Sequence, residues 1–206
     1  MSALLEVRNI SRSFGSTRAV DDVSFAVREG ELLGLIGPNG AGKSTLFNVI
    51  AGVIPPTFGE ILLNGAVVTG WKPYAMARAG VARTFQIPKP YRQLSVVENV
   101  MMSAFLRTKS MAAARELADT VLADVGLTAY RETAANVLTV GLLKRLEVAR
   151  ALATRPKLVL FDEIMAGLTP TEVGAMTEMV AGLPARAPRI AAPCCSMATT
   201  SVASRD

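Results

Sequence analysis

The chain has 206 residues, 50% of them hydrophobic and 19% charged, and this composition excludes an intrinsically disordered protein. The formal net charge is +5 with no basic run, so a nucleic-acid partner is not expected. There is no histidine, which excludes a Ser-His-Asp triad and histidine-based metal sites. No apolar run reaches the roughly 18 residues of a membrane helix, and no export signal is visible, so we expect a cytoplasmic chain.

The first third of the chain predicts strands around one helix. Residues 4–10 and 23–27 alternate between apolar and polar positions, as half-buried strands do. Residues 32–36 (LLGLI) form a nearly continuous apolar run, which predicts a strand buried on both faces. An apolar helix follows and ends at Gly52. Residues 60–63 predict a strand closed by the turn Asn64-Gly65.

The rest of the chain is mostly helical. Apolar spacing predicts helices over 75–80, 95–107, 111–125, 142–153 and 171–183, and an apolar strand over 158–161. The helix over 142–153 reads as strongly amphipathic: Leu142, Leu146, Ala149 and Leu152 share one face, and Lys144, Arg145 and Arg150 lie largely off it. Residues 184–206 show neither helical nor strand periodicity, and we expect them to be unstructured.

The segment Gly37–Ser44, GPNGAGKS, fits the pattern G-x-x-x-x-G-K-[ST] between an apolar strand and a helix. Its glycines let backbone N–H groups converge on phosphate oxygens at the positive end of the helix. Lys43 reaches the β- and γ-phosphates, and the Ser44 hydroxyl ligates Mg²⁺. A chance glycine-rich turn is the alternative, and the flanking strand and helix argue against it. The predicted nucleotide-binding residues here are Gly37, Asn39, Gly40, Ala41, Gly42, Lys43, Ser44 and Thr45.

Two carboxylates follow the apolar strand at 158–161. On its own, Asp162-Glu163 would more often be a strand that meets solvent. Together with the phosphate loop, the pair predicts that Asp162 holds Mg²⁺ and that Glu163 polarises the attacking water.

At this point the sequence resembles the ATP-binding subunit of an ABC transporter. The resemblance implies that Phe14 stacks on adenine and that Val20 flanks the same base. It implies that Gln86, in RTFQ, contacts Mg²⁺ and the attacking water. Residues 138–142, LTVGL, stand where the family has LSGGQ. Thr139 and Gly141 keep the hydroxyl and the second glycine that contact the partner's ATP, whereas Val140 and Leu142 depart from the pattern.

The segments GVARTFQ, QLSVVENVMMSAF and AGLTPTE resemble the branch that takes up branched-chain amino acids, and urea and short-amide importers look similar. The resemblance covers residues 1–183 and implies an α/β P-loop NTPase. A small antiparallel subdomain and a helical subdomain over about 90–150 would accompany the core. Implied partners are transmembrane permease subunits, bound at the inner face of the membrane, and a second ATPase subunit, identical or paralogous.

The family's pattern continues with a strand that ends in a switch histidine, and residues 184–206 do not match it. We therefore expect a core sheet that is incomplete at its C-terminal end, from a truncated or frameshifted gene. Three hypotheses follow: a working transport ATPase, an ATP-binding module that hydrolyses poorly, and a gene remnant that does not fold stably. A soluble two-cassette protein and a GTPase are disfavoured, since one cassette and no N-K-x-D motif are present.

Overall fold

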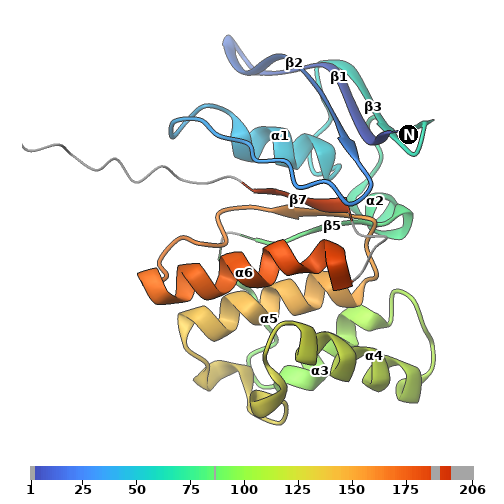
Figure 1. Ribbon diagram of the computed structural model, residues 1–206. Helices are drawn as coiled ribbons and strands as arrows, with labels where there is room; N and C mark the ends of the chain where they lie inside the picture. The colour runs from blue at the N-terminus through green and yellow to red at the C-terminus, as the bar shows by residue number, and fades with distance from the viewer. Residues whose placement is uncertain (1–2, 86, 187–190, 196–206) are drawn as a thin grey trace, which may run out of the picture.

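The computed structural model describes residues 3–85, 87–186 and 191–195. Its layers follow one another from top to bottom in Figure 1: an antiparallel sheet, the helix α1, a small parallel sheet, the helices α5 and α6, and the helices α3 and α4. The mixed α/β architecture predicted from the sequence is confirmed, with its antiparallel and helical parts.

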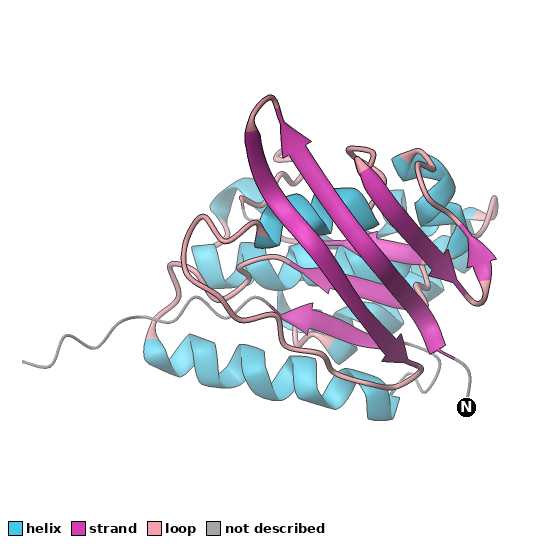
Figure 2. Ribbon diagram, turned by 90° about the horizontal axis from the view of Figure 1, so that it is seen from above, coloured by secondary structure: helices cyan, strands magenta, loops and turns pink. Residues whose placement is uncertain are grey.

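The antiparallel sheet contains β1 (Ala3–Phe14), β2 (Thr17–Arg28), β3 (Phe58–Leu63) and β4 (Ala66–Val67), in the order β2-β1-β3-β4. Figure 2 shows it as a twisted layer above the helices. The turn between β3 and β4 is made by Asn64 and Gly65, with φ of 51° and 75°. Both values suit the two-residue hairpin turn that this dipeptide predicts.

The parallel sheet contains β5 (Val81–Arg83), β6 (Leu158–Phe161) and β7 (Ala191–Cys195), in the order β5-β6-β7. The strand β7 lies within the range where no element was expected. Its backbone pairs with β6 in parallel, from Leu158 opposite Ala191 to Phe161 opposite Cys195. A five-residue strand that contains a proline carries too little alternation to be read from sequence.

The expected strand at residues 32–36 is not formed as such, since only Gly34 makes a bridge. Leu33 and Leu35 pack against the core, whereas Leu32 and Ile36 are 51% and 70% exposed. The apolar run predicts a strand buried on both faces, whereas in the structure only one face of the segment is covered. The prediction of a doubly buried strand is therefore wrong for the described residues.

The helices are α1 (Lys43–Ile50), α2 (Pro73–Ala79), α3 (Val96–Ala104), α4 (Met111–Asp124), α5 (Val140–Ala153) and α6 (Pro170–Arg186). Two 3-10 turns, Thr128–Tyr130 and Ala135–Val137, join α4 to α5. These bounds agree with the predicted helices to within a few residues. No helix in the described part of the chain combines the length and the apolar character that crossing a bilayer requires.

Two hydrophobic clusters hold these layers together. One lies between the antiparallel sheet and the parallel sheet and includes Phe47 of α1, and the other lies among α3, α4, α5 and α6. The strand β6 separates them: Leu158 and Leu160 belong to the first cluster, and Val159 and Phe161 belong to the second. This alternation follows from the two-residue repeat of a strand. The carboxylates that follow β6 are therefore carried by a strand packed on both faces.

Candidate active site

The glycine-rich segment forms a tight loop against β2 and leads directly into α1. Gly42 precedes the helix at φ 81°, and a Cβ at this position would lie 2.0 Å from the carbonyl oxygen of Ala19. Glycine is therefore required both by the left-handed conformation and by the close approach to β2. No side chain of the described residues caps the first turn of α1. Its N–H groups are thus available to an anion at the positive end of the helix.

Lys43 lies folded over this loop. Its Nζ donates hydrogen bonds to the carbonyl oxygens of Gly37, at 2.6 Å, and Pro38, at 2.8 Å. The ammonium is thus held by the backbone that surrounds the expected phosphate position. A positive charge and the N–H groups of α1 converge on the same place.

A pocket of about 410 Å³ opens at this loop. It is lined by Ala19, Asn39, Gly40, Ala41, Gly42, Lys43, Ser44, Thr45 and Glu163. Its volume lies within the range of small-molecule sites, about 300–1,000 Å³. The structure therefore brings seven of the eight predicted loop residues together with Glu163, which is 120 positions away from Lys43 in the chain. Gly37, the eighth, is tied to Lys43 by the bond described above.

Asp162 and Glu163 adopt different environments at the end of β6. Asp162 is 3% exposed, and its backbone N–H donates to the hydroxyl of Thr84 at 3.3 Å. Its Oδ2 accepts a hydrogen bond from Arg83 at 2.8 Å. Its Oδ1 is buried and has no hydrogen-bond partner among the described residues. Glu163 has φ 47°, in the left-handed region that residues with a side chain seldom adopt, and it lines the pocket.

These donors fit a magnesium ion. Magnesium in nucleotide sites uses one or two carboxylates together with phosphate oxygens and water, rather than a cage of protein ligands. Within the described residues, no group of three or more cysteine, aspartate or glutamate side chains is arranged to hold a metal ion. The buried Oδ1 of Asp162 supplies an oxygen that has no partner in the described part of the chain, and Ser44, whose side chain carries a hydroxyl, lines the pocket. Gln86, the third predicted ligand, lies outside the described residues.

Lys144 and Glu147 show that α5 is buried on more than one face, which the amphipathic interpretation of residues 142–153 missed. Lys144 is 4% exposed, and its Nζ donates to the carbonyl oxygen of Glu163 at 3.1 Å. Burial lowers the pKa of the Lys144 ammonium, against the opposing charge of Glu163. Burial raises the pKa of Glu147, and the ion pair with Arg150, at 3.0 Å, partly opposes this. The prediction that Lys144 lies off the packed face is wrong.

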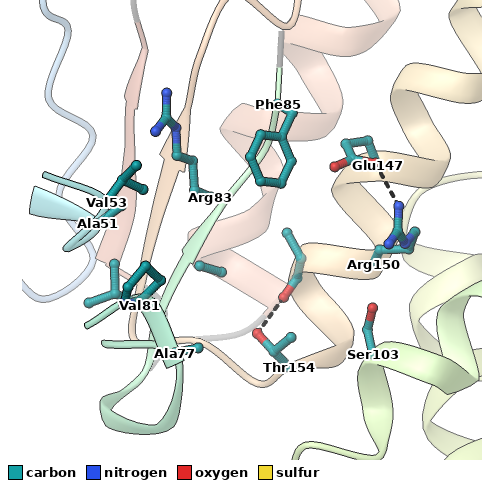
Figure 3. A pocket seen from close by; sticks show the side chains of 13 residues that line it. Ala51, Val53, Ala77, Val81, Arg83, Phe85, Ser103, Glu147, Arg150 and Thr154 are labelled. Carbon is teal, nitrogen blue, oxygen red and sulfur yellow. Dashed lines mark hydrogen bonds and ion pairs between the residues drawn. The ribbon is translucent and has the colours of Figure 1, made fainter. Parts of the chain in front are cut away.

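A second pocket lies between α2, α3, β5 and α5, on the other side of Arg83 (Figure 3). Its volume is about 260 Å³, and small apolar side chains such as Val53, Val81 and Ala151 line its floor. Phe85 stands beside it with 52% of its surface exposed. The Glu147–Arg150 pair forms a polar edge, from which the side chain of Arg83 extends away. The pocket is an apolar depression with charged borders.

The N-terminus of α5 forms a third pocket, separate from the glycine-rich loop. Thr139 caps the helix, because its Oγ1 accepts a hydrogen bond from the N–H of Leu142 at 3.4 Å. Gly141 packs so closely on α6 that a Cβ would lie 2.3 Å from Oε1 of Glu172. Thr139, Gly141, Leu142 and Glu172 line this pocket together. The retained glycine thus has a packing reason within the chain itself.

The two residues expected to contact adenine are not among the described residues that line the loop pocket. Phe14 is 48% exposed, and the Arg12 guanidinium stands over its ring at 4.6 Å. Val20 is 5% exposed and packs within the first cluster, with Cγ2 at 3.3 Å from where a Cβ of Gly42 would be. Val20 thus supports the loop from beneath. Neither residue is among the described residues that line the pocket.

Comparison with known proteins agrees with this geometry. The model of the family described as "ABC transporter" matches residues 20–166. A high-affinity branched-chain amino acid transport ATP-binding protein, LivG of Salmonella typhimurium, is 37% identical over 195 residues, covering 87% of this chain and 76% of its own. BraF of Pseudomonas aeruginosa, with the same description, is 36% identical with the same coverage. The lipopolysaccharide export system ATP-binding protein LptB of Acidithiobacillus ferridurans is 36% identical over 186 residues, covering 90% and 77%.

Solved structures give the same result. A nucleotide-free ATP-binding cassette from an ABC transporter superposes with a TM-score of 0.82 at 29% identity, over 95% of this chain and 81% of that one. The ADP conformation of an ATP-binding cassette of an ABC transporter gives the same TM-score, identity and coverage.

Proposed function

Because the chain belongs to the ABC transporter family of ATP-binding subunits, we propose that it couples ATP binding and hydrolysis to the uptake of branched-chain amino acids through a membrane permease. The observation that carries the proposal is the pocket in which the glycine-rich loop, Lys43 and Glu163 meet beside the buried Asp162. Loop and carboxylates come from distant parts of the sequence, and phosphoryl transfer needs both.

In the proposed reaction, water attacks the γ-phosphorus of ATP. The bond between the γ-phosphorus and the oxygen that bridges to the β-phosphate breaks, and ADP is the leaving group. The N–H groups at the start of α1 and the Lys43 ammonium hold the phosphate oxygens. Glu163 accepts a hydrogen bond from the attacking water and orients it. Asp162 and Ser44 would hold Mg²⁺, together with Gln86, and the ion would neutralise phosphate charge. Phe14 would stack on adenine, with Val20 beneath the loop. Most of the catalytic effect is then positioning and charge stabilisation.

We propose that the active unit contains two such subunits, identical or paralogous. The pocket at Thr139 and Gly141 is separate from the loop pocket, so one chain does not bring its own signature to its own nucleotide. A helix N-terminus suits an anion, and α5 presents one in this second pocket. A second subunit facing the first would place its α5 against the first subunit's nucleotide.

The apolar depression beside Arg83 is the proposed contact with the permease. Its apolar floor and charged border suit a short amphipathic segment of a partner. It lies directly behind β5, whose last residue contacts Asp162. This position would join the membrane partner to the nucleotide site and would hold the subunit at the inner face of the membrane.

The amino-acid cargo rests on the LivG and BraF relatives, and the LptB relative marks lipopolysaccharide export as the second candidate. Transport of labelled leucine tests the difference. A bacterial strain that lacks its own branched-chain ATP-binding subunit should regain leucine uptake when it produces this chain, and should not regain it with Lys43→Ala. Binding of MgATP without any restored uptake would refute the amino-acid cargo and leave the ATPase assignment intact.

Nucleotide binding is tested by thermal unfolding with and without MgATP. At one hundred times the dissociation constant, ATP should add about 2.7 kcal/mol to the free energy of unfolding, which raises the midpoint by several degrees. Lys43→Ala should abolish the shift and leave the ligand-free midpoint nearly unchanged, since the hydrogen bonds that the ammonium donates to described residues go to the loop carbonyls of Gly37 and Pro38. A native protein that unfolds cooperatively and shows no shift would refute the proposal.

A further inference from the structure

Arg83 is the last residue of β5, and its guanidinium joins two elements of the nucleotide site. Its Nη1 donates to Oδ1 of Asn48 on α1 at 2.5 Å. Its Nη2 donates to Oδ2 of Asp162 after β6 at 2.8 Å. The side chains of Arg83 and Asp162 are only 13% and 5% exposed. A planar guanidinium holds two acceptors in a fixed relative orientation, which a lysine ammonium does not.

The acceptor on α1 stands one helical turn beyond a predicted magnesium ligand. Residues four apart lie on the same face of a helix, so Asn48 lies on the face of α1 that carries Ser44. Arg83 therefore ties that face of α1 to the strand end that carries Asp162. Both predicted ligands are fixed relative to each other through one side chain.

Two polar groups of Asp162, its N–H and its Oδ2, have hydrogen-bond partners, and its Oδ1 has none among the described residues. Its N–H donates to Thr84 and its Oδ2 accepts from Arg83, so the last residue of β5 and the residue that follows it fix the position of Asp162. Its Oδ1 remains buried without a partner among the described residues. A buried oxygen without a partner is costly unless a ligand completes it, and a carboxylate that binds metal through one oxygen is commonly held by a hydrogen bond at the other.

We propose that Arg83 is a positioning residue of the magnesium site: it holds Asp162 by Oδ2, leaves Oδ1 for the metal or its water, and fixes Asp162 relative to the Ser44 face of α1. The proposal rests on the proposed function, because it requires MgATP to bind at the loop. Partners of this kind influence metal affinity by about 10- to 100-fold. Arg83 also borders the apolar depression, so the same side chain connects that surface to the metal site.

The experiment measures how much Mg²⁺ strengthens nucleotide binding. The dissociation constant of a fluorescent, non-hydrolysable ATP analogue is determined in EDTA and in saturating Mg²⁺, and the ratio of the two is the metal enhancement. Arg83→Lys should reduce the enhancement about tenfold or more. The dissociation constant in EDTA should stay the same, because Lys43 and the loop N–H groups are untouched. A purely structural role would change both constants by the same factor.

Two further variants keep the test decisive. Asn48→Ala preserves the Arg83–Asp162 pair, so it leaves no unpaired buried charge, and it should lower the enhancement by a smaller factor. Arg131→Lys is the matched control: Arg131 holds Asp119 through two hydrogen bonds, at 2.6 and 3.1 Å, far along the chain in the helical part. It should leave the enhancement unchanged.

The outcomes separate the two proposals. A native protein that does not bind the analogue at all would refute the proposed function. Native binding with an enhancement that survives both Arg83→Lys and Asn48→Ala would refute only the role of Arg83. If Arg83→Lys fails to fold, Asn48→Ala decides alone: a reduced enhancement supports the proposal, and an unchanged one overturns it.

Discussion

The Nζ of Lys144 donates a hydrogen bond to the backbone carbonyl oxygen of Glu163, across 3.1 Å, from a helix that starts at the signature segment. Glu163 sits in the left-handed region at φ 47°. A residue with a side chain costs about 1–2 kcal/mol there, so neighbouring contacts must hold it. Lys144 lies one turn into α5, and the N-terminus of that helix forms the pocket of Thr139 and Gly141. One helix thus joins the signature to the backbone of the predicted catalytic residue.

Lys144→Met should lower ATP turnover at least tenfold and leave the affinity for MgATP nearly unchanged. Methionine fills a similar volume in the buried site but offers no donor to the Glu163 carbonyl, so the carboxylate loses its fixed orientation. Steady-state hydrolysis and equilibrium binding of the analogue are measured side by side. Lys157→Met, at an exposed lysine before β6, is the control and should retain turnover. Full activity in Lys144→Met would contradict the role assigned to this hydrogen bond.

The start of α6 predicts a pH-dependent contribution to stability. Glu172 accepts hydrogen bonds from the N–H and the hydroxyl of Thr169, both at 2.9 Å, and the backbone bond is the first cause that lowers the pKa of Glu172 below 4.5. The folded state therefore binds this proton less readily than the unfolded state. The contribution is present above pH 4.5 and is lost as the pH falls through the lowered pKa.

Glu172→Gln removes this titrating group. Its melting midpoint should lie below that of the native protein at pH 7, and the difference should shrink as the pH falls below 4.5. Melts from pH 7 to pH 3 measure the difference at each step. Glu178→Gln, at an exposed position further along α6, should track the native protein throughout. A gap between native and Glu172→Gln that stays constant with pH would rule out the linkage.

Substitutions at two glycines with positive φ distinguish the free-energy cost of backbone strain from the cost of a steric clash. Gly59 has φ 90°, and a Cβ there would lie 2.4 Å from the carbonyl oxygen of Asn9. Gly65 has φ 75° and open space around it. Gly65→Ala should therefore cost only the left-handed strain, about 1–2 kcal/mol. Gly59→Ala should cost more than that, because β1 and β3 must also move apart. Urea unfolding of the two variants measures both losses in the free energy of unfolding. Equal losses would show that β1 shifts without cost and would contradict the steric argument.

Asn99 fixes the segment that leads into α3. It is fully buried, its Nδ2 donates to the carbonyl oxygens of Tyr91, Leu94 and Ser95, and its Oδ1 accepts from the N–H of Tyr91. Asn99→Ala should lower the free energy of unfolding by about 2–4 kcal/mol, since several buried backbone groups lose partners at once. Chemical denaturation measures the loss, with exposed Asn136→Ala as control. A loss below 1 kcal/mol for Asn99→Ala would contradict this role.

Much of the fold was readable because the signals were local. The pattern from Gly37 to Ser44, the Asn64-Gly65 turn and the apolar spacing of the helices each specify a structure within a few residues. The strand β6 was predicted at its observed bounds, since four apolar residues and two carboxylates mark both ends. The convergence of Glu163 with the loop also followed from the motifs alone, and the pocket agrees with it.

The remaining features depend on contacts between distant segments. The sequence does not indicate that Arg83 reaches both Asn48 and Asp162, because the three residues come from three separate elements. The prediction that Lys144 lies largely off the apolar face is wrong because helical periodicity describes one packed face, whereas α5 is buried on several. The prediction of a doubly buried strand at 32–36 is wrong because it assumed too much burial. Apolar composition indicates a preference for burial, but tertiary packing decides which faces of a segment are covered.

The packing of β6 between the two hydrophobic clusters limits how far this strand can move on its own. Side chains on one face are locked into the nucleotide-side core and those on the other into the helical core, so this strand is the least able of its neighbours to shift independently. Asp162 and Glu163 extend from that anchored end. A displacement of either core is therefore passed through β6 to the two carboxylates, which move with the packed layers on both sides of the strand and not independently of them.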